Sequence, residues 1–528
     1  MSRAAFATAC ALAGAWVLSR AWIADDAFIT WRVIENLLAG HGLRWNADER
    51  VQVFTHPLWA LLHVPLVAAT GSLAVASFAL SALCLGLAGA CAWRATGRDR
   101  AVFTLALVVP LTASRAFADH AVSGLESPLV ALCTAAFAAL ALRARAPGED
   151  PAWFGLSLAA SLLATARPDA LLLVLPGLAA LALRDGVRWG RLALGTLPLV
   201  AWELFSLLYY GFAFPNTMYA KLGTGIPLSA LLRQGLFYAG DLVRRDAGSA
   251  AILVLALGLA AARARAALAR RDAVPGDALT FAALGAGVAL HAAFAIGVGG
   301  DFMSGRFFAP AIFLAALLVA RALRGRPREA GAVAALALAA SLATLAGRPA
   351  DPDATWHGIA DERRVFEHTT AVLRRPGIRD GAPERHPWFR DGSAARERAR
   401  ASGRPVAIVR GAVGMLGYAA GPEVIVIDEF ALGDALLARL PAATPGRWRI
   451  GHFRRELPAG YLRAREGGDP SGLQPDLARY WEDLRLATSG GLLDPARLRA
   501  IARLNLGGDD ARLDAYLRSL PAPTPTPR

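Results

Sequence analysis

Long apolar runs separated by short polar loops fill residues 1–347, and they constrain the fold more than any other feature of the chain. A membrane-spanning helix needs about 20 largely apolar residues. Runs of this kind lie near residues 4–23, 73–93, 101–117, 127–142, 152–166, 168–183, 190–210, 249–262, 278–298, 307–320 and 329–347. We therefore expect a mainly α-helical, polytopic transmembrane domain of about eleven spans over residues 1–347.

The basic residues predict how these spans are oriented. The formal net charge is +14, and all strong cations except one lysine are arginines, many of them at the ends of apolar runs. If the N-terminus is cytoplasmic, the inside loops are rich in arginine, whereas the outside loops 118–126, 167–169 and 299–306 contain very little. Cytoplasmic loops carry such an excess, so we expect the N-terminus inside and residues 348–528 outside. Arginines placed in this way argue against a nucleic-acid partner.

The composition also predicts the compartment. Abundant Ala, Gly, Leu and Arg are typical of a GC-rich bacterial genome, so the expected bilayer is the bacterial cytoplasmic (inner) membrane. The shorter apolar stretch 57–70 is interpreted as a re-entrant or juxtamembrane helix, and the amphipathic stretch 229–245 as an interfacial helix. Residues 348–520 read as a small extracytoplasmic α/β domain, with strands near 404–410 and 423–430 and helices near 359–375 and 476–487. The tail 521–528, PAPTPTPR, is expected to be disordered.

Polar residues of the membrane half gather in segments predicted to lie outside. These segments are ADDAFITWR (24–32), GHGLRWNADERVQVFTHPLW (40–59), SGLESPL (123–129), RPD (167–169), FPNTMYAKL (214–222) and GGDFMSGRFFAP (299–310). Charged groups beside hydrocarbon are costly and mark functional sites by default. Their convergence on one side predicts a cavity on the outside face. The candidate substrate-binding residues are His56, Glu126, Arg167, Asp169, Asn216, Tyr219 and Asp301.

The adjacent carboxylates Asp25 and Asp26 are the clearest indication of a functional site in the sequence. Neighbouring residues on a helix point about 100° apart, so at most one of them faces a cavity squarely. The other then caps a helix or pairs with Arg32 or Arg306, unless both merely end the first span in water. Lys221, the single lysine, and Arg306 are candidate phosphate ligands, because an ammonium binds phosphate as a point charge and a guanidinium as a planar fork. For Arg306 a simple ion pair with Asp301 is an equal alternative.

These segments together resemble GT-C-type membrane glycosyltransferases, most closely the cell-wall terminal β-arabinofuranosyltransferase group. The resemblance rests on DDAFITWRVIENLLAGHGLRWNADERVQVFTHPLW, SGLESPL, RPD, PNTMYAKL, GGDFMSGRFFAP and the C-terminal GMLGYAAGPEVIVIDEFALGDALLARLP and WRIGHFRRELPAGYL. It implies transfer of a sugar from a polyprenyl-phosphate carrier to an extracytoplasmic glycan or glycolipid acceptor. It also implies that Asp25 or Asp26 is the catalytic carboxylate. The donor sugar, arabinofuranose or another, stays open.

Two rival functions remain at this level. A transporter or flippase of a lipid-linked substrate would place charged groups near the middle of the membrane and often contain internal repeats, and neither feature is evident here. A scaffold whose outside domain binds glycan is the other. The sequence contains no phosphate-binding loop, no serine-hydrolase elbow and no zinc-binding pattern. It supports no cofactor and no metal ligand, although a divalent cation is compatible with it.

Overall fold

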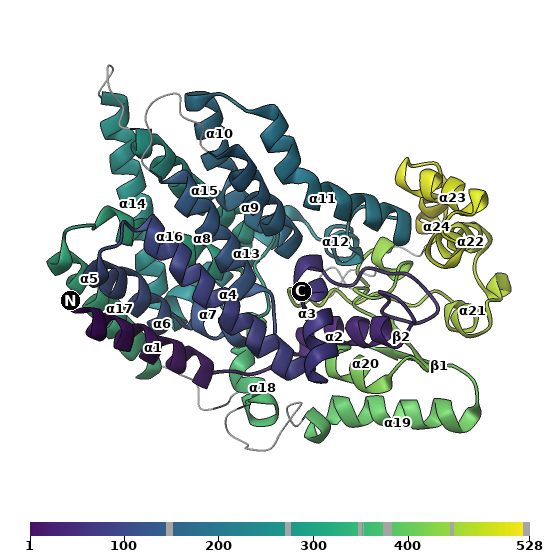
Figure 1. The fold of residues 1–528 in the computed structure, drawn as a ribbon. Coiled ribbons are helices and arrows are strands. Elements are labelled where there is room, and N and C mark those ends of the chain that lie inside the picture. The colour runs from purple at the N-terminus through teal and green to yellow at the C-terminus, as the bar shows by residue number, and fades with distance from the viewer. Residues whose placement is uncertain are drawn as a thin grey trace. The chain divides into compact units, whose positions relative to one another are not determined.

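The computed structural model describes residues 1–143, 152–269, 276–346, 351, 353–372, 383–443 and 448–520, which are mainly helical (Figure 1). The chain divides into two compact units. The first unit comprises Met1–Ala24, His56–Val200 and Leu228–Gly381. The second comprises Asp25–Thr55, Ala201–Pro227 and Ala382–Arg528. Each unit is therefore assembled from segments that lie far apart in the sequence.

The first unit is built from helices. Its α-helices are α1 (Arg3–Ser19), α3 (Pro57–Thr70), α4 (Leu73–Ala95), α5 (Arg100–Phe103), α6 (Val109–Ala113), α7 (Arg115–Ala118), α8 (Ser127–Ala141), α9 (Trp153–Ala166), α10 (Leu175–Asp185), α13 (Leu228–Arg245), α14 (Ala247–Ala269), α15 (Gly276–Gly297), α16 (Ala309–Ala322), α17 (Pro327–Ala346) and α18 (Glu362–Thr370). Short π or 3₁₀ elements are η1 (Thr104–Val108), η2 (His120–Val122), η3 (Pro168–Leu173) and η4 (Arg306–Phe308). Helix α11 (Trp189–Tyr209) runs from this unit into the second.

Several apolar helices are long enough to cross a membrane. Among the described residues these are α4, α11, α14 and Asp277–Gly297 of α15. The pair Arg100–Ala113 and Arg115–Val122, bent by 74°, would make a fifth. The expectation of a mainly helical protein with several apolar spans is confirmed in this form. The predicted count of eleven spans is not.

Most of the other predicted spans form helices that are shorter than a bilayer. Helix α9 has 14 residues and α8 has 15, so at 1.5 Å per residue each is only about 21–23 Å long. For α9, the local sequence explains why the helix ends early. Pro168 follows the last residue of α9 after one position, and the residue before a proline is biased away from helical backbone. Within the described residues, helix length therefore identifies fewer full-length spans than the apolar runs predict, and the count of eleven stays a prediction.

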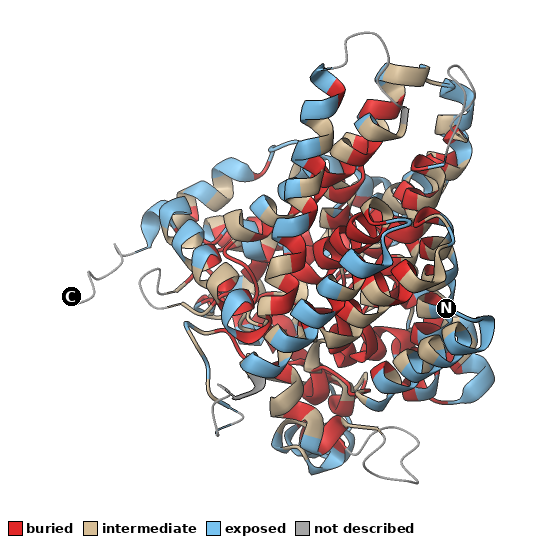
Figure 2. Cartoon of the chain, turned by 90° about the vertical axis from the view of Figure 1, so that its left-hand side faces the viewer, coloured by how far each residue is buried: buried red, intermediate tan, exposed pale blue. Residues whose placement is uncertain are grey.

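The core of the first unit surrounds helix α16. Every residue from Ala309 to Ala320 is buried, and α16 packs against α8, α14 and α15. A helix that is apolar on all sides is stable only where other helices cover it. By contrast, large apolar side chains stay exposed on other helices, for example Leu183 and Val254. Figure 2 shows exposed residues, in pale blue, beside buried residues, in red, on many of the helices. Such exposed apolar residues are expected of helices that contact lipid.

The second unit combines helices with a small parallel sheet. Its elements are α2 (Asp25–Leu38), α12 (Asn216–Leu222), η5 (Pro383–Arg385), α19 (Pro387–Ser402), β1 (Val406–Arg410), α20 (Gly414–Ala420), β2 (Val424–Asp428), η6 (Leu437–Arg439), α21 (Tyr461–Gly467), η7 (Pro470–Gly472), α22 (Pro475–Ser489), α23 (Pro495–Asn505) and α24 (Asp510–Ser519). Strands β1 and β2 pair in parallel, with Val406 opposite Val424 and Arg410 opposite Asp428. The β-rich runs and the helix near 476–487 lie where the sequence placed them.

The division into units cuts the chain differently from the predicted domains 1–347 and 348–520. Segments 25–55 and 201–227, which the sequence assigned to the membrane half, belong to the same compact unit as most of the C-terminal region. The predicted boundary depends on membrane topology and stays a prediction. So does the interfacial position of α13, which is a helix over the expected residues. The tail 521–528 lies outside the described residues.

Candidate functional site

The predicted site residues fall into both units, and each group is described within its own unit. The first unit contains His56, Glu126, Arg167, Asp169, Asp301 and Arg306. The second unit contains Asp25, Asp26, Asn216, Tyr219 and Lys221. All six residues of the first group come together in one buried network, which also includes His291. We call these seven residues the arginine–carboxylate cluster.

Most members of this cluster lie at or beyond the ends of helices. His56 directly precedes α3, and Glu126 directly precedes α8. Arg167 follows the last residue of α9. Asp301 and Arg306 lie on the loop between α15 and α16. Polar groups at the ends of apolar helices are what the sequence pattern predicted, and the fold brings them to a single place.

Arg167 is held by two carboxylates. Its Nη1 donates to Glu126 Oε1 at 3.0 Å, and its Nε lies 3.0 Å from both carboxylate oxygens of Asp169. The guanidinium also stacks over the Phe307 ring, 4.7 Å from its centroid. The same Oδ2 of Asp169 also lies 3.2 Å from His291 Nε2. Charge-assisted contacts on two sides and an aromatic face fix the plane of this arginine.

Glu126 is the anion on which the cations converge. His56 Nδ1 lies 3.3 Å from its Oε2, and Arg306 Nη2 lies 3.8 Å from its Oε1. Burial by itself raises the pKa of this carboxyl group, but the charges of His56, Arg306 and Arg167 outweigh burial and lower the pKa to about 2. Glu126 therefore stays ionised over the whole physiological range.

The loop that carries Asp301 and Arg306 is shaped by glycine and tyrosine. Gly300 has φ of +75°, and a Cβ at this position would meet the Tyr238 ring at 2.2 Å. The Tyr238 hydroxyl donates to Met303 O at 2.9 Å and accepts from Phe307 N at 3.0 Å. Arg306 Nη1 then lies 3.7 Å from Asp301 Oδ2. Both of these contacts, to Glu126 and to Asp301, are longer than a charge-assisted hydrogen bond of about 2.7–2.9 Å.

In the second unit, Asp25 binds the start of helix α20. Its Oδ1 accepts from Met415 N at 2.7 Å, and its Oδ2 accepts from Gly414 N at 3.2 Å. The sequence predicted that one member of the Asp25–Asp26 pair caps a helix, and Asp25 does so. Counted as whole residues, Asp25 and Asp26 are both of intermediate exposure.

The three residues near α12 have different environments. Asn216 Nδ2 donates to the carbonyls of Ala431, Leu432 and Asp434 at 2.9–3.1 Å, so its side chain supports the loop after β2. Tyr219 lies against Arg439, whose guanidinium is 4.6 Å from the ring centroid. Lys221 is exposed, and within the described residues its ammonium has neither a hydrogen bond nor an ion pair.

Comparison with known proteins gives one informative result. No family model matches the chain, and no solved structure matches it. The terminal β-(1→2)-arabinofuranosyltransferase of Mycobacterium tuberculosis is 28% identical to it over 533 aligned residues. Over most of its length, this chain is similar to a glycosyltransferase. The match covers 84% of the chain and 82% of the relative, so it supports the resemblance drawn from the short motifs.

Sequence reasoning missed His291, which completes the arginine–carboxylate cluster, and Tyr238, which binds the backbone of the loop that carries Asp301 and Arg306. His291 lies inside a candidate membrane span and is fully buried. A histidine within an otherwise apolar run is a detectable signal, because ionisable residues in spans are rare and usually face a polar interior. Tyr238 lies on α13 and gave no such signal, since amphipathic helices commonly contain tyrosine.

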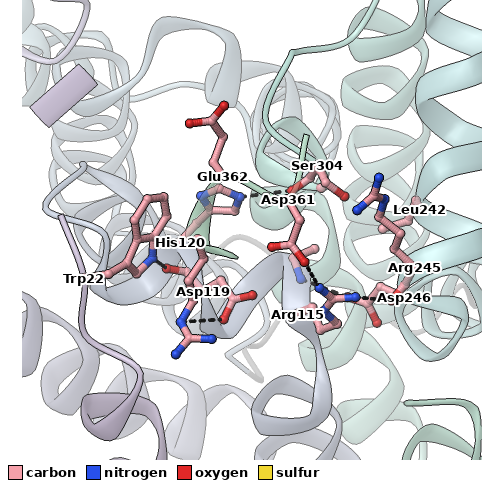
Figure 3. Close-up of a pocket in the computed structure, with 13 residues that line it drawn as sticks. Trp22, Arg115, Asp119, His120, Leu242, Arg245, Asp246, Ser304, Asp361 and Glu362 are labelled. Carbon is pink, nitrogen blue, oxygen red and sulfur yellow. Dashed lines mark hydrogen bonds and ion pairs between the residues drawn. The ribbon is translucent and has the colours of Figure 1, made fainter. Parts of the chain in front are cut away.

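Ser304 and Gly305 of the loop 301–306 line a small pocket. Figure 3 shows its lining, which includes Trp22, His120, Ser304 and Asp361. Arg115 forms an ion pair with Asp361, and His120 Nε2 lies 3.1 Å from Ser304 O. The cavity volume of about 20 Å³ is room for a single water molecule. It is too small for a sugar ring in this conformation.

No part of the described chain groups three or more His, Cys, Asp or Glu side chains for metal binding. The chemistry that the site residues themselves can supply is proton transfer by a carboxylate and anion binding by Lys221, Arg167 and Arg306.

Asp25→Asn is expected to flatten the pH dependence of stability between about pH 4 and 7. Burial raises the pKa of Asp25 to about 7, although hydrogen bonds from Met415 and Gly414 oppose this shift. An unfolded aspartate titrates near 3.9, so the contribution of Asp25 is fully present below about pH 4 and is lost as pH rises through 7. Thermal unfolding in detergent across this window measures the effect. Equal slopes for wild type and variant would show that Asp25 does not titrate there.

Proposed function

We propose that this chain is a GT-C-type membrane glycosyltransferase. It transfers a sugar, with arabinofuranose as the first candidate, from a polyprenyl-phosphate donor to a glycan or glycolipid acceptor outside the bacterial cytoplasmic membrane. The observation that carries the proposal is the similarity to an arabinofuranosyltransferase over most of both chains. The apolar helices support a membrane location. The N-terminus inside and the C-terminal region outside remain part of the proposal.

The reaction requires a base and a site for the leaving phosphate. A carboxylate of the Asp25–Asp26 pair takes the proton of the acceptor hydroxyl while the acceptor oxygen bonds to the anomeric carbon. The bond from that carbon to the phosphate oxygen breaks, and polyprenyl phosphate leaves with the bonding electrons. General-base catalysis of this kind contributes about 10²–10⁴ in rate.

Cationic side chains stabilise the leaving phosphate in this proposal. Lys221 and Arg306 are the phosphate ligands, because an ammonium binds phosphate as a point charge and a guanidinium binds it as a planar fork. Arg167 has two close carboxylate contacts, so we assign it to orienting Glu126 and the substrate rather than to direct charge neutralisation. Preorganised cations aimed at developing negative charge usually provide the largest single contribution to catalysis.

The test is a transfer assay in detergent with a panel of radiolabelled polyprenyl-phosphate sugars and a set of glycan acceptors. Wild type is compared with Asp25→Asn and Asp26→Asn. We expect transfer from one donor by wild type and a loss of about 10²–10⁴-fold in at least one variant. Folded wild-type protein that transfers from no donor would contradict the proposal. Movement of an intact labelled lipid across vesicles would instead support a transporter or flippase.

Lys221→Ala is expected to weaken donor binding without affecting the fold. A hydrogen bond between charged partners is worth about 1.5–3 kcal/mol, which corresponds to a loss of roughly 10- to 100-fold in donor affinity. Because Lys221 is exposed, the unfolding temperature should not change. Arg404→Ala, which removes another exposed cation of the second unit, is the control. Equal donor affinity of wild type and Lys221→Ala would remove Lys221 from the phosphate site.

A further inference from the structure

The start of helix α2 is bound closely to the start of helix α20. Both carboxylate oxygens of Asp25 accept backbone hydrogen bonds, from Gly414 and Met415. The approach is so close that a Cβ at position 414 would lie 2.0 Å from the Asp25 carbonyl oxygen and 2.5 Å from its Cγ. Only glycine therefore allows this contact. The carboxylate is held by α20 as well as by its own helix.

A second glycine of α20, Gly417, also lies close to side chains of the N-terminal segment. A Cβ at Gly417 would meet the Trp45 ring at 2.3 Å and Arg32 Nη1 at 3.2 Å. Arg32 Nη1 donates to Gly417 O at 2.6 Å. A strand followed by a glycine-rich turn and a helix commonly brings backbone amides to a nucleotide phosphate. Here the strand β1 and the glycines of α20 present those amides to Asp25 instead.

This contact separates the two adjacent carboxylates. Successive residues on a helix point about 100° apart, so Asp26 cannot share the place that Asp25 occupies on α20. Asp26 is also partly exposed, in the first turn of the same helix. Because α20 holds Asp25, the first residue of α2, the first turn of α2 is fixed in place. The backbone orientation of Asp26 is therefore fixed as well. Such positioning matters because a displacement of about 1 Å in a reacting group can lower a rate by about 10²-fold.

We propose that Asp25 is a positioning residue, bound by the amides of Gly414 and Met415, and that Asp26 is the catalytic base that takes the acceptor proton. This assignment rests on the proposed glycosyl transfer. It makes α20, which contributes no side chain to the chemistry in this scheme, necessary for the orientation of the base.

The experiment compares the initial transfer rates and unfolding temperatures of six proteins: wild type, Asp26→Asn, Asp25→Asn, Asp25→Ala, Gly414→Ala and the double variant Asp25→Ala with Gly414→Ala. Gly467→Ala is the matched control, because a Cβ there meets no atom within 4 Å. We expect Asp26→Asn to lose about 10²–10⁴-fold in turnover with an unchanged unfolding temperature. Asp25→Ala and Gly414→Ala should each lose up to about 10²-fold.

Three further readouts distinguish positioning from simple destabilisation. The double variant should be no slower than the slower single variant, because either change already removes the contact between Asp25 and the start of α20. Asp25→Asn should recover part of the rate lost in Asp25→Ala, since its amide oxygen still accepts one hydrogen bond. The acidic limb of the pH profile of kcat/KM should persist in Asp25→Asn, because the base is still present.

Several results would overturn the assignment. Full transfer by Asp26→Asn, or loss of the acidic limb in Asp25→Asn, would make Asp25 the base. Independent, additive losses in the double variant would show that the α20 contact does not act through Asp25. Absence of transfer by wild type would instead contradict the proposed function itself, so the two failures are distinguishable.

Discussion

Replacing Glu126 with alanine is expected to be the most destabilising single change in the first unit. Glu126 is 1% exposed, and the guanidinium groups of Arg167 and Arg306 and the His56 ring lie within 3.8 Å of its oxygens. Removing one partner of a buried ion pair leaves an uncompensated buried charge and costs about 3–5 kcal/mol. We therefore expect a strongly lowered unfolding temperature in detergent and loss of donor binding.

The pH dependence provides a second check on Glu126. Its folded pKa of about 2 lies below the value of about 4.3 for unfolded glutamate. Its stabilisation is therefore present above about pH 4 and is lost as pH falls towards 2, and the alanine variant should lack this acid-dependent loss. Glu423→Ala is the control, because Glu423 also binds two arginines but is partly exposed, where such pairs contribute about 0–1 kcal/mol. Equal effects of the two substitutions would contradict the buried-anion interpretation.

Replacing Arg32 with alanine is expected to disrupt the second unit. The buried guanidinium donates to the carbonyls of Trp45, Gly417 and Val424 at 2.6–2.8 Å. Each buried carbonyl left without its donor costs about 1–3 kcal/mol, so the joined segments should separate. Limited proteolysis should then cleave the C-terminal region of the variant faster than that of wild type, and transfer should be lost.

Lysine at position 32 should not restore the protein, because a single ammonium cannot reproduce the planar fork of a guanidinium. Arg400→Ala is the control for charge, since Arg400 is largely exposed and binds only at the surface. A proteolysis rate like that of wild type in Arg32→Ala would show that other contacts hold the segments together.

Local pattern was enough to predict the helical class and the two strands, but not the way in which the chain is partitioned. Apolar runs such as 73–93 and the β-rich run 423–430 are read directly from periodicity and length. The association of residues 25–55 with the C-terminal region depends on Arg32 and Asn46 reaching the carbonyls of Val424 and Val426. Such pairings join positions hundreds of residues apart, and no local propensity encodes them.

The candidate site was predictable to the extent that its residues break an apolar pattern. Glu126, Arg167 and Arg306 stand out at the ends of helices, and the fold brings them together. Asn216 is a different case, because its amide donates to three backbone carbonyls, a structural role that the sequence did not indicate, and its role as a substrate ligand stays a prediction. The glycines at 414 and 417 were not singled out, because their importance lies in the close approach of another helix.

The pairing of Arg32 with Val424 also has a consequence for biosynthesis. The two residues are 392 positions apart, and a ribosome adds about 5–20 residues per second. For roughly 20–80 s, therefore, the newly made N-terminal segment exists without the strand that its arginine will bind. During this interval its guanidinium and the indole of Trp45 must remain hydrated or be shielded by a chaperone. Variants that slow synthesis of residues 382–428 would prolong this exposed state and should increase degradation of the nascent protein.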